Sequence, residues 1–159
     1  MTPAELQQYL HDHIPLSKAM QVAVVSASPD AVVLRAPLAP NINHRETVFG
    51  GSASALAILS AWSLLHVRLC DSGIGCRLVI QRNSVEYLLP MDGEFTAASV
   101  LARPEDWPRF LRMLERRGTA RAAVVAELSC KGVTAGRFEG DFVALGSKAG
   151  GAAMADAGG

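Results

Sequence analysis

Residues 41–52 read Asn-Ile-Asn-His-Arg-Glu-Thr-Val-Phe-Gly-Gly-Ser, and an apolar run follows them to about Leu69. The polar first half is typical of a turn, whereas the run behind it has an unbroken helical pattern. Two adjacent glycines, Gly50 and Gly51, allow another molecule to approach the backbone closely. The first N–H groups of a helix have no partner within it, so this position is suited to a developing negative charge.

The helix predicted over residues 51–69 is apolar on nearly every side, which indicates burial all round. Its longest apolar run, residues 53–67, is broken by serines and is shorter than the roughly 20 residues that a membrane span needs. We therefore expect a core helix and no membrane association. A helix of this kind in a small domain requires a sheet curled around it.

The rest of the chain supplies the elements of such a sheet. Thr2-Pro3-Ala4-Glu5 is a capping box, which predicts a helix over residues 3–12 that stops before Pro15. An amphipathic helix is predicted from Pro104 to a C-cap at Gly118. Strands are predicted over residues 21–26, 31–38, 77–89, 94–103, 120–130 and 133–145. This order indicates an α+β protein of the hot-dog fold, with one antiparallel sheet wrapped around one long helix.

The strand at residues 77–89 has no clean apolar face. Alternation places Val79, Gln81, Asn83, Val85 and Tyr87 on one face and the intervening residues on the other. This pattern is expected of a strand that leaves the core partway or faces a partner chain. The glycine- and alanine-rich residues 147–159 have no pattern, so we expect a disordered tail after a single domain of residues 1–146.

Composition excludes several classes of function. Fifteen basic and fifteen acidic residues give a formal net charge of zero, which argues against nucleic acid or an anionic membrane as a partner. Cys70, Cys76 and Cys130 are odd in number and have no CxxC spacing, as expected of reduced thiols in a cytoplasmic protein without a zinc site. His11-Asp12-His13 has no further ligand cluster, so we expect no metal and no cofactor. No signal peptide is predicted at the amino terminus.

Several of these segments resemble those of a known family, the YiiD C-terminal-type hot-dog domains, often described as thioesterases. The similar segments are Ala36–Asn43 and Thr47–Ser52, with support from Ile14–Met20 and Glu86–Pro90, so that the resemblance covers about residues 1–145. The family includes Mad-type malonyl-acyl-carrier-protein decarboxylases, which make acetyl-acyl carrier protein to start fatty acid synthesis. In this family the second asparagine of Asn-x-Asn is implicated in catalysis, and it matches Asn43.

The central helix lacks the group that hydrolysis of a thioester usually needs. Many hot-dog thioesterases carry a carboxylate about two turns into this helix, where the present chain has Ile58, and residues 51–69 contain no Asp or Glu. Decarboxylation of a malonyl thioester needs instead hydrogen-bond donors for an enolate oxygen. Asn43 and the Gly51 amide fit that need, with Ser52 beside them. The residue types therefore favour decarboxylation, with hydrolysis as the alternative and a non-catalytic acyl-thioester-binding module as the third reading.

Each candidate residue also has an ordinary structural role. Asn41 and Asn43 suit an Asx turn, and the Gly50-Gly51 pair suits tight packing at a helix start. Ser52 is a typical N-cap residue. His44 and Glu46 are common in solvated loops, although Glu46 is the candidate base for hydrolysis.

We therefore predict one thioester site with a docking surface nearby. The catalytic candidates are Asn43, Gly51 and Ser52, and the substrate-binding candidates are Asn41, His44, Thr47, Phe49, Gly50, Asn83 and Tyr87. Arg109, Arg112 and Arg116 share one helical face, which suits docking of an acidic acyl carrier protein or is simply solvated. The resemblance implies a homodimer or higher oligomer with sites between protomers, acting on carrier-protein or CoA thioesters.

Overall fold

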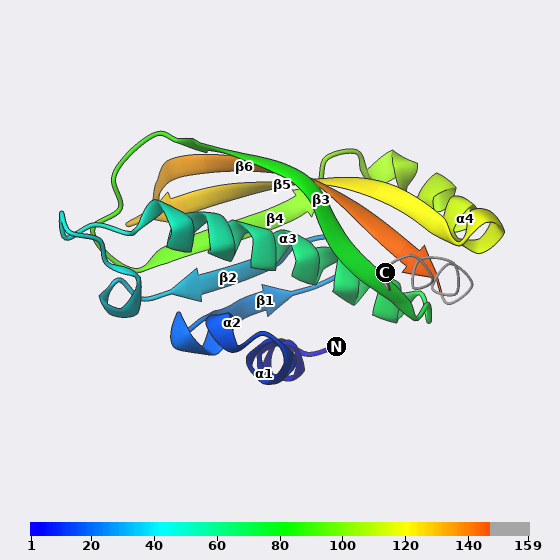
Figure 1. The fold of residues 1–159 in the computed structure, drawn as a ribbon, viewed down its shortest axis with the longest axis horizontal. Helices are drawn as coiled ribbons and strands as arrows, with labels where there is room; N and C mark the ends of the chain where they lie inside the picture. The colour runs from blue at the N-terminus through cyan, green and yellow to red at the C-terminus, as the bar shows by residue number, and fades with distance from the viewer. Residues whose placement is uncertain (147–159) are drawn as a thin grey trace, which may run out of the picture.

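A computed structural model describes residues 1–146, so the predicted tail lies outside the described residues. In chain order the elements are α1 (Pro3–His13), α2 (Pro15–Ala19), β1 (Ala23–Ala27), β2 (Val32–Ala36), η1 (Ala39–Asn41), α3 (Gly50–Asp71), β3 (Cys76–Tyr87), β4 (Phe95–Leu101), η2 (Pro104–Asp106), α4 (Trp107–Arg117), β5 (Thr119–Cys130) and β6 (Val133–Gly146). The strands form one antiparallel sheet in the order β1-β2-β4-β5-β6-β3. This sheet curves around α3, as Figure 1 shows, and the predicted hot-dog fold is confirmed.

The helix α3 is the centre of the core. Leu56, Leu64 and Leu65 are fully buried, as are the facing Phe95 and Phe142 of the sheet. An 18-residue window of α3 has a mean hydropathy of 1.5, enough for a membrane span by composition, but 61% of that window is buried inside the protein. Burying such side chains stabilises the fold by about 1.5–3 kcal/mol each, which explains why the helix is apolar all round.

Buried hydroxyl groups connect α3 to the sheet. Ser60 Oγ lies 3.1 Å from the carbonyl oxygens of both Val32 and Ala97, and Ser99 Oγ donates to Ser60 Oγ at 2.8 Å. These contacts join α3 to β2 and β4. Ser60 is thus accommodated in the core because polar partners are provided for it, whereas the buried Ser63 Oγ has no hydrogen-bond partner among the described residues.

The first helix begins as predicted, but a second short helix follows it. Thr2 Oγ1 accepts from the Glu5 amide at 3.2 Å, and Glu5 Oε2 accepts from the Thr2 amide at 2.7 Å, which completes the capping box. The first helix ends before Pro15. The helix α2 then starts at Pro15 and was not predicted; proline is well tolerated at the first position of a helix.

The predicted faces of β3 are wrong beyond Ile80. Ile80 pairs with Phe142 and Arg82 pairs with Asp141, so Gln81 is an additional residue that forms a β-bulge. A one-residue shift moves every later side chain to the opposite face. Val85 therefore packs against the same core as Leu78 and Ile80.

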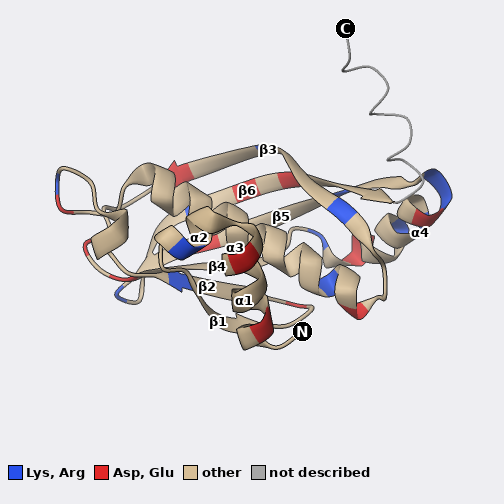
Figure 2. Cartoon of the chain, turned by 60° about the horizontal axis from the view of Figure 1, so that its bottom comes forward, with Lys and Arg blue, Asp and Glu red and all other residues tan. Residues whose placement is uncertain are grey.

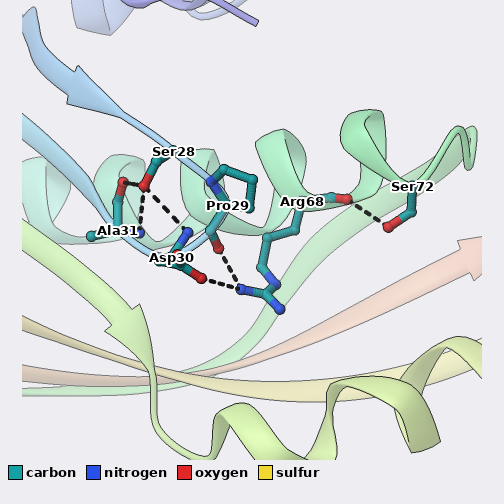
Figure 3. A network of polar contacts seen from close by, with 6 residues as sticks. All are labelled: Ser28, Pro29, Asp30, Ala31, Arg68 and Ser72. Atoms are coloured by element: carbon teal, nitrogen blue, oxygen red, sulfur yellow. Dashed lines mark hydrogen bonds and ion pairs between the residues drawn. The ribbon is translucent and has the colours of Figure 1, made fainter.

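The far end of α3 is held by Arg68. Its side chain is largely buried, donates to the carbonyl of Pro29 in the β1–β2 turn, and lies 3.8 Å from Asp30 (Figure 3). Its guanidinium carbon lies 4.5 Å from the centre of the Trp107 ring at the start of α4. Arg68 thus joins three segments, and α4 packs beside it through Phe110 and Leu114 against Leu69.

Candidate active site

The loop before α3 is closed by backbone hydrogen bonds. The Asn43 amide donates to Thr47 O, and the Phe49 amide donates to Asn41 O, both at 2.8 Å. The Val48 amide donates to Met91 O at 2.8 Å and so fixes the loop to the segment before β4. Glu46 is at the tip with a φ of 61°, a conformation that closes the turn. The loop therefore has one defined shape against the start of α3.

Asn43 is the residue around which this loop closes. Its Oδ1 accepts from the amides of Arg45 at 2.8 Å and Thr47 at 3.2 Å. Its Nδ2 donates to Thr47 Oγ1 at 3.0 Å and, in a long bond of 3.4 Å, to Val48 O. The Asx-turn role is thus filled, and the weaker of the two donor contacts is the one that a ligand can most readily replace.

Asn41 lies beneath the loop and is 2% exposed. Its Nδ2 donates to Met20 O at 3.0 Å and to Pro37 O at 2.8 Å. Its Oδ1 is buried, and no hydrogen-bond partner for it is found among the described residues. These contacts fix the base of the loop to the segments on either side of the β1–β2 hairpin, and the Asn41 side chain is buried in a single protomer.

The start of α3 is open and uncapped. Phe49 is the N-cap residue, and no side chain accepts from the first turn of α3. Among the described residues, the earliest α3 amide with a backbone partner is that of Ala53, which donates to Phe49 O at 3.0 Å. The amides of Gly50, Gly51 and Ser52 are consequently oriented as donors toward the outside of the helix. Ser52 is the third helical residue, so the alternative in which it caps the helix is wrong.

Two exposed rings flank this helix start. Tyr87 Oη donates to Gly50 O at 3.0 Å, which attaches the end of β3 to α3. A Cβ at Gly51 would lie 2.4 Å from the ring of Phe49, so the absence of a side chain lets that ring lie directly over the backbone. Phe49 and Tyr87 are 57% and 54% exposed, so a single protomer leaves the helix start accessible.

The other predicted residues are less closely gathered. Thr47 is in direct contact with Asn43, whereas His44 is exposed on the loop and Asn83 lies opposite Gly140, four residues along β3 from Tyr87. Ile58 is half-buried and packs against the core, and the first turn of α3 has no acidic residue.

The predicted docking arginines are distant from the loop. Arg109, Arg112 and Arg116 are exposed on α4, which packs near Leu69 at the carboxyl end of α3. A 22-residue helix spans about 33 Å, so α3 separates these arginines from Gly50 by about 30 Å. Figure 2 shows α4 and the loop before α3 at opposite ends of the molecule.

Known structures define the class of protein to which this chain is similar. A protein of unknown function from Chlorobaculum tepidum TLS shares 28% identity, with a TM-score of 0.85 over 91% of this chain and 97% of that chain. A "putative thioesterase" from Shewanella oneidensis shares 26% identity, with a TM-score of 0.80 over 90% of this chain and 96% of that chain. A thioesterase from Haemophilus influenzae, at 12% identity and a TM-score of 0.74 over 92% of each chain, has the same fold.

The family itself is defined by a match along nearly the whole described chain. The family model YiiD_C, described as "Putative thioesterase (yiiD_Cterm)", matches residues 3–146. The chain belongs to this family, as the resemblance in the loop and helix start predicted.

Proposed function

We propose that this protein is an enzyme acting on acyl thioesters, and that its reaction is decarboxylation of a malonyl thioester. The product is an acetyl thioester, suited to the initiation of fatty acid synthesis. The observation that carries the proposal is the uncapped start of α3: three outward amides follow directly on the loop that closes around Asn43, and the helix has no carboxylate in its first turn. Family membership supports the thioester substrate.

The proposed reaction needs stabilisation of charge and little else. The bond between the carboxylate carbon and the α carbon breaks, CO₂ leaves, and the electron pair forms an enolate on the thioester oxygen. The Gly51 amide and Asn43 Nδ2 donate to that oxygen, and each such donor typically lowers the barrier by about 3–4 kcal/mol. The α carbon then takes a proton, delivered by Ser52, Thr47, His44 or water, to give the acetyl group.

In this mechanism Asn43 exchanges one of its contacts. The 3.4 Å bond from Nδ2 to Val48 O is replaced by a bond to the enolate oxygen, while the bond to Thr47 Oγ1 remains. The contacts of Oδ1 with the Arg45 and Thr47 amides hold the side chain in place throughout. Such preorganised donors are effective because they need not reorient when charge develops.

Hydrolysis of the thioester is the second candidate, and the family description favours it. In this chain the carboxylate nearest in sequence to the helix start is Glu46, at the exposed tip of the loop. Glu46 would have to activate the attacking water, because Ile58 occupies the position where a helix carboxylate is expected. The third candidate is binding of acyl thioesters without turnover.

The proposed assembly is a homodimer or higher oligomer in the cytoplasm, acting on carrier-protein or CoA thioesters. The edge strand β3 is exposed along most of its length, and Phe49, Tyr87 and Leu89 form an exposed apolar rim near the helix start. A second protomer at this edge would cover the rim. In such a dimer, a carrier protein docked on Arg109, Arg112 and Arg116 of one protomer would deliver its thioester to the helix start of the other protomer. The distance along α3 within one protomer would then not prevent docking near the site.

One assay distinguishes the three reactions. Purified protein is incubated with malonyl- and acyl-loaded carrier protein and with the corresponding CoA thioesters, and the products are identified by mass. Acetyl-carrier protein or acetyl-CoA supports decarboxylation, free thiol supports hydrolysis, and unchanged thioester bound to the protein supports a binding module. A large loss of activity in Glu46→Gln together with thiol release would establish hydrolysis instead.

A further inference from the structure

A groove rich in arginine begins beside α4, at the end of the molecule away from the loop before α3 (Figure 2), and extends to Arg82 of β3. Its walls are α4 and the start of β5, where residues 119–122 pair with β6 but extend beyond the end of β4. One hollow of about 420 Å³ is lined by Arg103, Arg109, Arg117 and Arg121, with one carboxylate, Asp106. An adjoining hollow of about 590 Å³ shares Arg103 and Arg121 and adds Arg82 and Asp141. We call these two hollows the arginine groove.

The arginine groove concentrates positive charge in a protein whose formal net charge is zero. Arg82 pairs with Asp141 at 2.8 Å, and Arg103 pairs with Asp106 at 3.0 Å. None of the ion pairs among residues 1–146 includes Arg109, Arg117 or Arg121. Five guanidinium groups and two carboxylates therefore leave three positive charges without a counter-charge in the groove.

The floor of the groove is apolar. Phe110, Met113 and Ala120 line the hollow beside α4, while Ala122 and Ala123 line the adjoining one. A concave site of several hundred Å³ with an apolar floor and a few charged groups is typical of small-molecule sites. Guanidinium groups bind phosphate oxygens through paired N–H donors, and planar groups stack on them.

We propose that the arginine groove binds a small organic polyphosphate of nucleotide size, at a site distinct from the thioester site. The phosphates lie between Arg109, Arg117 and Arg121, and the ring lies on the floor made by Phe110 and Met113. A hollow of this size suits a small molecule better than the side of an acidic protein. Because α4 packs at the carboxyl end of α3, a ligand held by Arg109 and Arg117 is about 30 Å from the thioester bound at the start of the same helix.

The test uses ADP as the probe and measures its binding to the full chain by calorimetry. We expect ADP to bind at concentrations up to about 1 mM, more tightly than adenosine, and more weakly as salt is added. Arg117→Gln with Arg121→Gln should weaken ADP binding by about tenfold or more. The matched control is Arg112→Gln with Arg116→Gln, which removes the same charge from α4 outside the groove and should leave binding within about twofold.

Two results would overturn the proposal. One is failure of ADP to bind while poly-glutamate does bind, which would identify a surface for acidic protein. The other is an equal loss of ADP binding in the groove variant and in its control, which would indicate only a diffuse positive field. Circular dichroism of each variant shows that the fold is retained.

A competition experiment with the CoA thioester substrate distinguishes two sources of the nucleotide. If the groove holds the nucleotide end of a CoA thioester bound to a partner protomer, ADP competes with that substrate and the groove variant raises its KM. If it holds a free nucleotide, ADP binds without affecting KM. ADP binding itself is measured without turnover, so it can succeed or fail independently of the proposed decarboxylation.

Discussion

Replacing Asn43 by aspartate separates its role in the loop from its role in catalysis. The carboxylate has the same shape as the amide and keeps an oxygen to accept from the amides of Arg45 and Thr47 at 2.8 and 3.2 Å. Only the Nδ2 donor is lost, with its bonds to Thr47 Oγ1 at 3.0 Å and Val48 O at 3.4 Å. The hydroxyl of Thr47 can turn to donate to the new oxygen, so the structural damage is small.

The expected magnitudes differ sharply between stability and rate. One hydrogen bond of ordinary length is lost, which lowers the free energy of unfolding by about 1 kcal/mol. The enolate oxygen loses a preorganised donor, which lowers kcat by about 10²–10³-fold. Thr47→Val is the comparison variant: it removes the Thr47 partner of Nδ2 and one of the candidate proton donors, but leaves the Nδ2 donor itself in place.

The assays are urea unfolding for stability and acetyl-thioester formation for rate. We expect Asn43→Asp to unfold at a slightly lower urea concentration than the wild type and to be almost inactive, while Thr47→Val, which keeps the Nδ2 donor, loses much less activity than Asn43→Asp. If Asn43→Asp keeps kcat within about tenfold, its Nδ2 contributes less than about 1.4 kcal/mol to the transition state and the proposed mechanism is refuted.

Two further predictions concern the far end of α3. The rings of His66, Tyr9 and Trp62 pack against one another, with the His66 ring 4.7 Å from each of the other two. Burial, reinforced by the nearby His13, lowers the pKa of His66 below its usual 6.5. Folding therefore favours the neutral ring, so the free energy of unfolding should fall as pH drops through about 6.5 and below. His66→Gln should flatten that dependence in urea titrations between about pH 8 and pH 5. A pH profile of stability that is unchanged in His66→Gln would contradict this reasoning. Arg68→Met should lower the free energy of unfolding by about 1–2 kcal/mol, because its bond to Pro29 O and its contact with Trp107 are lost. Asp30→Asn, at the exposed end of the ion pair, should change the free energy of unfolding by less than about 0.5 kcal/mol. Equal effects of the two variants in urea unfolding would mean that the ion pair matters more than the buried bond.

The helices α1, α3 and α4 and the positions of the strands along the chain were predictable because their signals are local. The capping box at Thr2 and the left-handed C-cap at Gly118, with a φ of 69°, both appear where the sequence indicates them. The apolar pattern of α3 identified the core helix, since a helix without a polar face must be buried. The fold class followed from these elements and their order.

The features that could not be predicted from the sequence depend on contacts between distant segments. The bulge at Gln81 has no local signal, and it is defined only by pairing with β6, yet it decides which residues of β3 face α3. Asn41 looks like a loop residue but is buried, because its amide meets the carbonyls of Met20 and Pro37. The arginine groove was missed because its residues come from β3, the loop after β4, α4 and β5.

The most direct test of the proposed mechanism is a crystal structure with a malonyl-thioester analogue in which a sulfonate replaces the carboxylate. We predict that the thioester oxygen lies about 2.7–3.1 Å from the Gly51 amide and from Asn43 Nδ2, with the bond from Nδ2 to Val48 O broken. The sulfonate should lie near Ser52, Thr47 or His44. A thioester oxygen bound away from the start of α3, or a water held by Glu46 in line with the thioester carbon, would contradict the account and favour hydrolysis.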